Sequence, residues 1–197
     1  MPKGRPRKFD TDKAVAQAML VFWKKGYEGT TIGDLTAAMC ISRPSLYAAF
    51  GNKEGLFKQA LDHYRNDPAS YVNRALAEPT AREAFAALLE GVISLVTDPE
   101  RPGGCLFVCG ALASSEESES IRDEVAARRI AGENDILVRF RRASAEGDLP
   151  PDADPKILAK LAATLLWGLS VQAVNGATPD ELRRVAEIAI DAFPTNK

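Results

Sequence analysis

The 197-residue sequence has one histidine and three cysteines, and it is poor in the groupings that catalysis requires. Enzyme active sites usually bring several titratable side chains together, yet His63 lies far along the chain from Cys105 and Cys109. The sequence also lacks a phosphate-binding glycine loop, a cluster of metal ligands and a nucleophile motif. We therefore expect no catalytic residue, no metal and no cofactor, and a small helical enzyme is the disfavoured alternative.

Other features that the sequence lacks concern membranes and disulfides. No apolar run approaches the roughly 20 residues that cross a bilayer. The basic start of the chain, MPKGRPRKFD, is not followed by the apolar core of a signal peptide. An odd number of cysteines fits a reducing compartment better than a disulfide framework. These observations predict a cytoplasmic protein without a membrane partner.

The composition favours an all-α fold whose two ends differ in charge. The chain is 46% hydrophobic, is rich in Ala, Leu, Glu and Arg, and has few β-branched runs. Residues 1–65 carry eleven Lys and Arg against six Asp and Glu, a net charge of +5. The whole chain has a net charge of −2, so the other 132 residues carry −7. A basic module that binds a polyanion, joined to an acidic body with its own apolar core, explains this better than a DNA-architectural protein does.

The stretch from Thr30 to Phe57, TTIGDLTAAMCISRPSLYAAFGNKEGLF, is the most informative part of the chain. Thr31 and Asp34 are spaced as a capping box that begins a short helix, and Met39-Cys40-Ile41 forms the turn. Ser42 caps a second short helix in which Pro44 is tolerated in the first turn. Gly51-Asn52 ends that helix and begins the next. Two short helices joined by a tight turn predict a helix-turn-helix that fits a DNA major groove.

The same stretch resembles the DNA-binding domain of the TetR family of bacterial transcriptional regulators. The residues that carry the resemblance are Thr30-Thr31, Asp34-Leu35, Ala37-Ala38, Ser42, Ser45-Leu46-Tyr47, Phe50, Lys53-Glu54 and Leu56-Phe57. Two positions depart from the family pattern. Cys40 replaces the usual turn glycine, where a Cβ is costly if φ is positive. Gly33 lies inside the first short helix and should cost about 1 kcal/mol relative to alanine.

Several residues of this stretch are expected to contact DNA. Arg43 is the candidate for base readout, because arginine can donate two hydrogen bonds to a guanine edge. The other expected contacts, with base edges or phosphates, are Thr31, Ser42, Pro44, Ser45, Tyr47 and Lys53. The resemblance places Tyr47 and Lys53 on backbone phosphates, although Tyr47 could instead be a packing residue. Arg5 and Arg7 lie in a basic arm that is either a minor-groove arm or a solubilising tail.

The pattern of helices divides the chain into residues 1–52, a three-helix DNA-binding domain with its basic arm, and residues 53–197. The second part begins with a linker helix over 53–76 that Pro68 breaks or kinks. It continues with helices over 80–96, 105–113, 117–145, 154–174 and 178–192, about nine helices in the whole chain. The helix over 154–174 is apolar nearly all round, which predicts burial on several sides.

By resemblance, the second part is a ligand-binding and dimerisation domain. The helices Asp154–Val174 and Thr178–Ala192 are expected to form a homodimer interface, so that two headpieces read a palindromic operator on double-stranded DNA. A monomer with an internal core helix is the alternative. The residues expected to line a ligand pocket are Phe85, Leu89, Val92, Cys105, Leu106, Phe107, Phe140 and Trp167, although each could be ordinary core. Their apolar character suggests a hydrophobic or amphipathic inducer.

Cys105 and Cys109 raise an alternative way of sensing a signal. Four residues apart, they share one face of a helix, and Cys105 lies near its N-terminus, where the helix dipole favours the reactive thiolate. These cysteines could sense an oxidant or electrophile, or they could be two small buried hydrophobes. The prediction as a whole is a ligand-responsive regulator, most often a repressor in this family, in which ligand changes the separation of the recognition helices.

Overall fold

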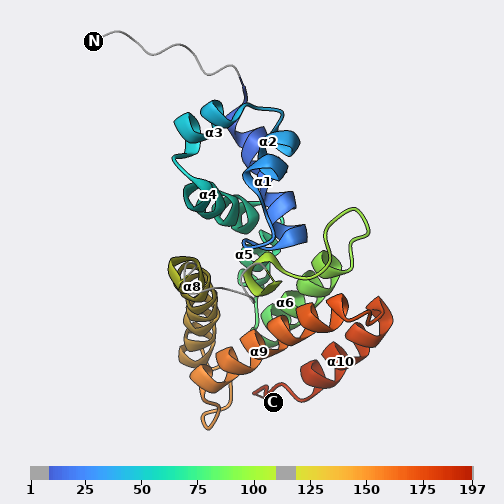
Figure 1. Ribbon diagram of the computed structural model, residues 1–197. Helices are drawn as coiled ribbons and strands as arrows, with labels where there is room; N and C mark the ends of the chain where they lie inside the picture. Colours follow the sequence, from blue (N-terminus) through green and yellow to red (C-terminus); the bar gives the residue numbers. More distant parts are fainter. Residues whose placement is uncertain (1–8, 110–118, 197) are drawn as a thin grey trace, which may run out of the picture.

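The computed structural model describes residues 9–109 and 119–196, with the side chain of Cys109 excepted, and every regular element in them is an α-helix. The described helices are α1 (Thr11–Lys25), α2 (Ile32–Met39), α3 (Arg43–Phe50), α4 (Lys53–Asn66), α5 (Tyr71–Ala75), α6 (Ala81–Val96), α7 (Leu106–Cys109), α8 (Glu119–Ala145), α9 (Pro155–Val174) and α10 (Pro179–Asp191). Figure 1 shows α1–α4 at one end of the molecule and α6, α8, α9 and α10 at the other. The predicted all-helical architecture is confirmed.

The N-terminal helices pack around one apolar core. Asp10 caps α1, because its carboxylate accepts from the backbone N–H groups of Asp12 and Lys13. The helix ends at Gly26, whose φ of 69° suits a residue without a Cβ. The fully buried side chains of this core include Phe22, Leu35, Leu46, Phe57 and Tyr64, which come from α1, α2, α3 and α4. Four short elements therefore share one core, which holds the helix-turn-helix in place.

The predicted linker helix over 53–76 is two helices in the structure. Helix α4 ends at Asn66, and the five-residue α5 begins at Tyr71. Pro68 explains the break, because proline has no N–H to donate and disfavours helical geometry in the residue before it. The buried residues of α4 belong to the N-terminal core. Helix α4 therefore packs with the helices before residue 52, although the sequence was divided after that residue.

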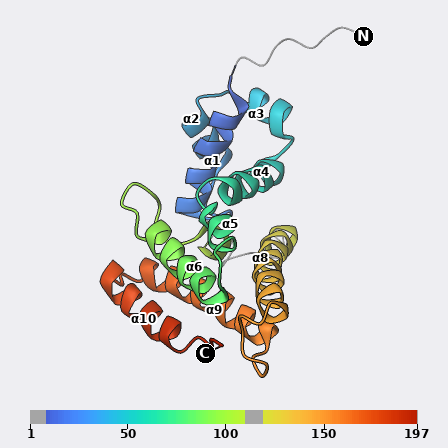
Figure 2. The same cartoon turned by 180° about the vertical axis from the view of Figure 1, so that it is seen from behind.

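The C-terminal part is a set of longer helices around a second core. Helix α9 contacts α6, α8 and α10, and Figure 2 shows it crossing behind α6 with α8 to one side. Capping boxes begin α6 at Thr80 and α10 at Thr178. The buried apolar side chains of this core include Phe85, Leu89, Phe140, Leu158 and Phe193.

Candidate DNA-binding surface and ligand cavity

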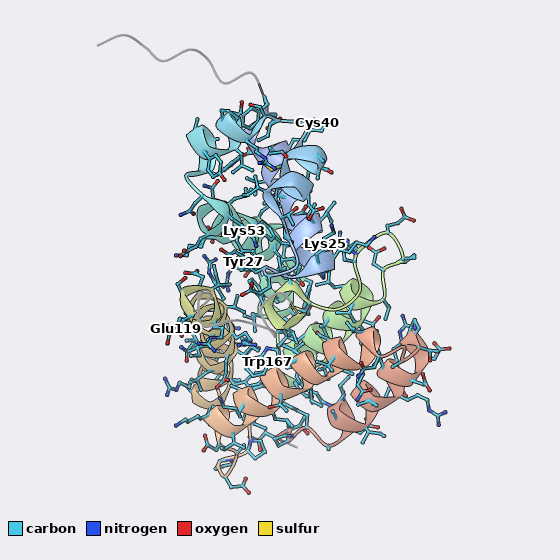
Figure 3. The ribbon with its side chains drawn as sticks, in the orientation of Figure 1. Lys25, Tyr27, Cys40, Lys53, Glu119 and Trp167 are labelled. Carbon is cyan, nitrogen blue, oxygen red and sulfur yellow. The ribbon has the colours of Figure 1, made fainter. Side chains whose placement is uncertain are left out.

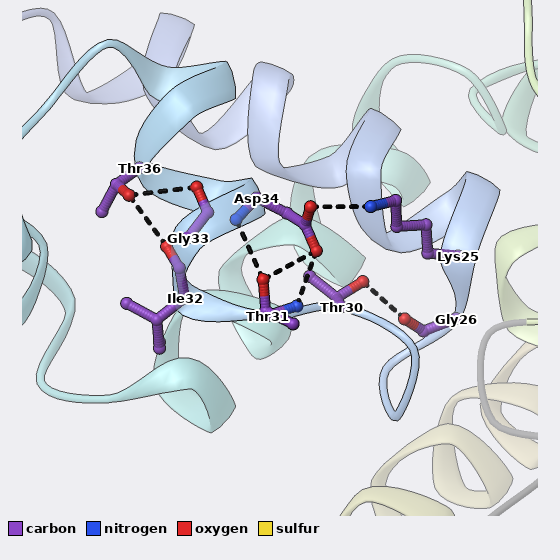
Figure 4. Close-up of polar contacts among 8 residues, drawn as sticks. All are labelled: Lys25, Gly26, Thr30, Thr31, Ile32, Gly33, Asp34 and Thr36. Atoms are coloured by element: carbon purple, nitrogen blue, oxygen red, sulfur yellow. Dashed lines mark hydrogen bonds and ion pairs between the residues drawn. The ribbon is translucent and has the colours of Figure 1, made fainter.

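The helix-turn-helix begins with the capping box that the sequence predicts. Thr31 Oγ1 accepts from the backbone N–H of Asp34 at 3.1 Å, and Asp34 Oδ2 accepts from the N–H of Thr31 at 2.9 Å (Figure 4). Lys25 Nζ donates to the other carboxylate oxygen of Asp34 at 2.7 Å. The hydrogen bonds from Lys25 and Thr31 lower the pKa of Asp34 to about 2. The box therefore fixes the start of α2 against the end of α1.

The turn between α2 and α3 takes the geometry that its sequence suggests. Cys40 has φ 52° and ψ 41°, and it is the non-glycine residue with positive φ in the described parts of the chain. Ser42 then caps α3, with its Oγ 3.3 Å from the backbone nitrogen of Ser45 and 2.9 Å from that residue's hydroxyl. The left-handed turn is thus formed with the Cβ of cysteine in place, at some cost in strain.

Helix α3 buries one face and exposes the face that was expected to meet DNA. Leu46 and Phe50 lie in the N-terminal core, whereas Arg43, Pro44 and Tyr47 are exposed, with 49% of Tyr47 accessible. Ser45 is partly buried, and its hydroxyl is hydrogen-bonded to that of Ser42. A short helix with an exposed arginine at its N-terminus matches the dimensions of a recognition helix.

The other predicted DNA contacts are Lys53 and the two arginines of the basic arm. Lys53 begins α4, and its Nζ lies 4.3 Å from the centroid of the Tyr27 ring, a pair that Figure 3 shows near the base of the N-terminal domain. Burial lowers the pKa of Lys53. The cation–π contact with Tyr27 positions the Lys53 ammonium group near the N-terminus of α4. Arg5 and Arg7 lie outside the described residues.

A cavity of about 90 Å³ lies between the linker helices and the C-terminal helices. Its walls come from α4, α5, α6, α8 and α9 and from the segment that contains α7. The residues that line the cavity include Tyr64, Arg65, Tyr71, Asn73, Val92, Cys105, Phe107, Arg128, Arg129, Glu133, Trp167 and Ser170. Because most of its walls are aromatic or apolar and a few polar groups face it, the cavity has the character of a small-molecule site.

Four of the eight residues predicted from sequence to line a ligand pocket lie in the wall of this cavity. Val92, Cys105, Phe107 and Trp167 line the cavity. The other four candidates do not line it. Phe85, Leu89 and Phe140 are fully buried in the C-terminal core, and Leu106 is fully buried in the N-terminal core. An apolar side chain on a helix packs wherever the nearest helix lies, and hydrophobicity alone does not distinguish a core from a cavity wall.

The tyrosines and arginines of the lining were not anticipated. Tyr64 and Tyr71 come from the linker, and Arg65 and Arg129 come from polar stretches of α4 and α8. The sequence carries one weak sign of them, because Tyr64 falls on the apolar stripe of a helix that otherwise buries hydrocarbon side chains. These residues come from three separate helices, α4, α5 and α8, and meet only through tertiary packing, which the local pattern does not encode.

Cys105 connects this cavity to the DNA-binding domain. The Tyr64 hydroxyl donates to Cys105 Sγ at 3.3 Å, and Trp23 Nε1 of α1 donates to the carbonyl oxygen of Gly104 at 3.1 Å. The Tyr64 ring meets the rings of Trp23 and Phe107 edge to face, with centroids 4.8 Å and 5.0 Å away. Burial and then the nearby Cys105 raise the pKa of Tyr64, so its hydroxyl stays protonated and remains a donor.

Ion pairs join the linker helix α4 to α8 across the cavity. Arg65 of α4 donates to Asp135 at 2.5 Å. Arg128 of α8 pairs with Asp62 of α4 and with Glu124 of its own helix, the latter at 2.7 Å. Arg65 and Arg128 also line the cavity, so both ion pairs between α4 and α8 lie at its wall.

Helices α9 and α10 expose apolar side chains on one side of the chain. The exposed residues of this face are Ile157, Leu161, Val171, Val174, Val185 and Ile188. The sequence predicted burial of α9 on several sides, but one chain alone leaves this face open. Helix α9 is also long and apolar enough to span a membrane by length and composition, so the expectation that no apolar run approaches 20 residues was wrong; one such helix is weak evidence for a membrane span. A third of this apolar stretch of α9 is buried, and core helices of soluble proteins can have the same length and composition.

Comparisons with known proteins agree with this geometry. Residues 14–60 match the family model "Bacterial regulatory proteins, tetR family", and residues 81–189 match "Tetracyclin repressor-like, C-terminal domain". The chain is 31% identical to the Escherichia coli K12 HTH-type transcriptional repressor ComR, over 98% of this chain and 92% of ComR. It is 28% identical to the repressor BdcR of the same strain, over 98% and 93% of the two chains.

A solved structure extends this likeness to three dimensions. The TetR family transcriptional regulator CifR, as a cysteine mutant in complex with a 26-base-pair operator, is 46% identical to this chain. It superposes with a TM-score of 0.92 and covers 96% of this chain and 100% of CifR. A helix-turn-helix domain joined to a helical C-terminal domain defines a transcriptional regulator that binds DNA. The chain belongs to the TetR family.

Proposed function

We propose that this protein is a ligand-responsive repressor that binds a palindromic operator as a homodimer and releases it when a small molecule enters the cavity. The observation that carries the proposal is the link between the cavity and the helix-turn-helix. Tyr64 and Cys105 line the cavity, and the first belongs to the N-terminal core while the second contacts it. The protein acts in the cytoplasm, where the chromosome lies.

In this proposal the exposed face of α3 enters the major groove. Arg43 reads a base edge, and Pro44 and Ser45 lie alongside it. Thr31, Ser42, Tyr47 and Lys53 contact phosphates, supported by the N-termini of α2, α3 and α4. Arg5 and Arg7 would extend the contact into a minor groove. The exposed positions of Arg43 and Tyr47 support these roles.

The dimer forms through α9 and α10. Their exposed apolar face, defined by the six residues named above, is the kind of surface that monomers rarely leave open. Gly168 lies on the same side of α9, and nothing lies within 4 Å of where its Cβ would be, so a second helix can approach closely. Two headpieces held by such an interface read half-sites roughly 34–36 Å apart.

The inducer acts by changing how the linker sits. A ligand in the cavity would displace the Arg65–Asp135 and Arg128–Asp62 pairs, the Tyr64–Cys105 contact, or both. Each of these holds a helix of the N-terminal core to the C-terminal domain. Release would favour a state in which the two recognition helices no longer match adjacent half-sites.

The test is operator binding. Fluorescence anisotropy with DNA flanking the coding sequence, across a salt series and with nonspecific competitor, measures affinity and phosphate contacts together. Competitor-resistant binding with a footprint of two half-sites supports the proposal. Binding with a steep salt slope but no sequence preference would contradict it.

A second candidate function is a thiol-based sensor, favoured by the place of Cys105 in the cavity wall. An electrophile such as iodoacetamide would form an S–C bond at Cys105 while the C–I bond breaks, with iodide leaving and the thiol proton passing to water. The adduct would disrupt the contact with Tyr64. Alkylation of the Cys40→Ser/Cys109→Ser protein should then lower operator affinity at least 10-fold. The idea fails if Cys105→Ser added to that background responds equally to the reagent.

A further inference from the structure

The polar groups in the cavity wall differ in whether they have partners. Arg65 and Arg128 are held by the carboxylates already described, Glu133 pairs with Lys160 at 2.6 Å, and the Ser170 hydroxyl donates to the carbonyl of Leu166 at 2.7 Å. Asn73 is exposed, so its amide is accessible to solvent. These groups are satisfied without a ligand.

Arg129 is the exception among the charged groups. It is half-buried on α8 and lines the cavity, but it makes no ion pair or hydrogen bond with any residue that the structure describes. A guanidinium is always charged and only donates hydrogen bonds. A half-buried guanidinium without a counterion in the wall of a mostly apolar cavity favours the binding of an anion there.

Tyr71 is a neutral group in the cavity wall whose hydroxyl has no partner among the described residues. Its ring lies directly against Gly91 of α6, where an added Cβ would stand 2.1 Å from Tyr71 Cδ2, so the glycine makes room for it. Its hydroxyl donates to no residue in the described parts of the chain. Burial, and then the nearby Cys105, raise the pKa of Tyr71, so the hydroxyl remains a protonated donor.

The Arg129 guanidinium and the Tyr71 hydroxyl are both donors, and most of the wall around them is aromatic or aliphatic. The volume of about 90 Å³ is of the order that holds a single ring or a short chain, since a dry engineered cavity of about 150 Å³ binds benzene. We propose that the cavity binds a small organic acid, with an apolar body against Trp167 and Phe107 and a carboxylate that accepts from Arg129. Tyr71 donates to an acceptor on the same ligand. The inference rests on the cavity being the inducer site.

The experiment compares acids with amides of the same shape. Benzoate, phenylacetate and hexanoate are titrated into the full-length protein by calorimetry, beside benzamide, phenylacetamide and hexanamide. We expect at least one acid to bind 10-fold or more tightly than its own amide. Arg129→Gln keeps a polar side chain without the charge and should abolish that preference. Arg122→Gln, an exposed arginine on the same helix outside the cavity, is the matched control and should retain it.

The outcomes separate this inference from the proposed function. An acid that binds with the Arg129 dependence supports the site, and operator release by the same acid supports regulation as well. Binding without operator release would keep the site and count against the ligand-responsive function. Equal binding of acids and amides, an unchanged preference in Arg129→Gln, or no binding of any acid would overturn the inference. A Tyr71→Phe protein should lose a further 2- to 10-fold in acid affinity.

Discussion

The two ends of this molecule differ in whether their polar groups have partners and their apolar side chains are buried. In the helix-turn-helix, Thr31, Asp34 and Ser42 accept the backbone hydrogen bonds that begin α2 and α3, and the exposed face of α3 is polar apart from Pro44 and Ala48. In the C-terminal domain an arginine faces a cavity without a counterion, and two helices expose aliphatic side chains. The helix-turn-helix is complete within one chain, whereas the C-terminal domain contains features that only a ligand or a second chain would complete.

The largest effect should come from breaking the proposed dimer. Ile188 is 73% exposed in one chain, so Ile188→Glu should leave the monomer folded while placing two charges in the interface. Operator affinity should fall by about 100-fold or more, because the second headpiece no longer binds at high effective concentration. Sedimentation and anisotropy measure the two effects. Ile130→Glu, a similarly exposed site on α8 at 60%, is the control and should change neither.

A smaller loss of operator affinity is expected from a substitution in the recognition helix α3. Arg43→Ala removes the candidate base contact without touching the N-terminal core, so the melting temperature should stay the same. Affinity for the operator should fall roughly 10- to 100-fold, while affinity for nonspecific DNA changes much less. Arg74→Ala, an exposed arginine on α5, serves as the comparison. Equal losses on operator and nonspecific DNA would reduce Arg43 to a phosphate contact.

The same contrast explains what the sequence could predict. Capping residues, the turn and the buried Leu46 and Phe50 follow from spacing along a few turns of chain, and the structure forms them as expected. The break in the linker follows from Pro68. The cavity could not be predicted in this way, because Tyr64, Trp167 and Arg129 meet only when α4, α9 and α8 pack together. Phe85 and Phe140 have the same local signature as Phe107 but face the C-terminal core.

Within the C-terminal domain, Arg139 offers a test of a buried charge that binds protein instead of ligand. It is buried, and its Nη2 donates to the carbonyl oxygens of Glu78 and Pro79 at 2.9 Å and 3.0 Å. Its Nε and Nη1 have no partner among the described residues. Arg139→Met should lower the free energy of unfolding by about 1–3 kcal/mol, because both carbonyls lose their donor. Denaturant unfolding measures this, with the exposed Arg142→Met as control; a more stable variant would show that the unpartnered charge outweighs its bonds.

The smallest expected effect is on stability, at the strained turn of the helix-turn-helix. Cys40 holds φ 52° at the C-terminus of α2, where a glycine would meet no steric penalty. Cys40→Gly should raise the free energy of unfolding by about 0.5–1 kcal/mol, since relief of the left-handed strain exceeds the extra entropy of glycine in the unfolded chain. Cys40→Ala keeps the Cβ and should leave stability unchanged. If alanine stabilises as much as glycine, the gain comes from removing the thiol, and the turn is not strained.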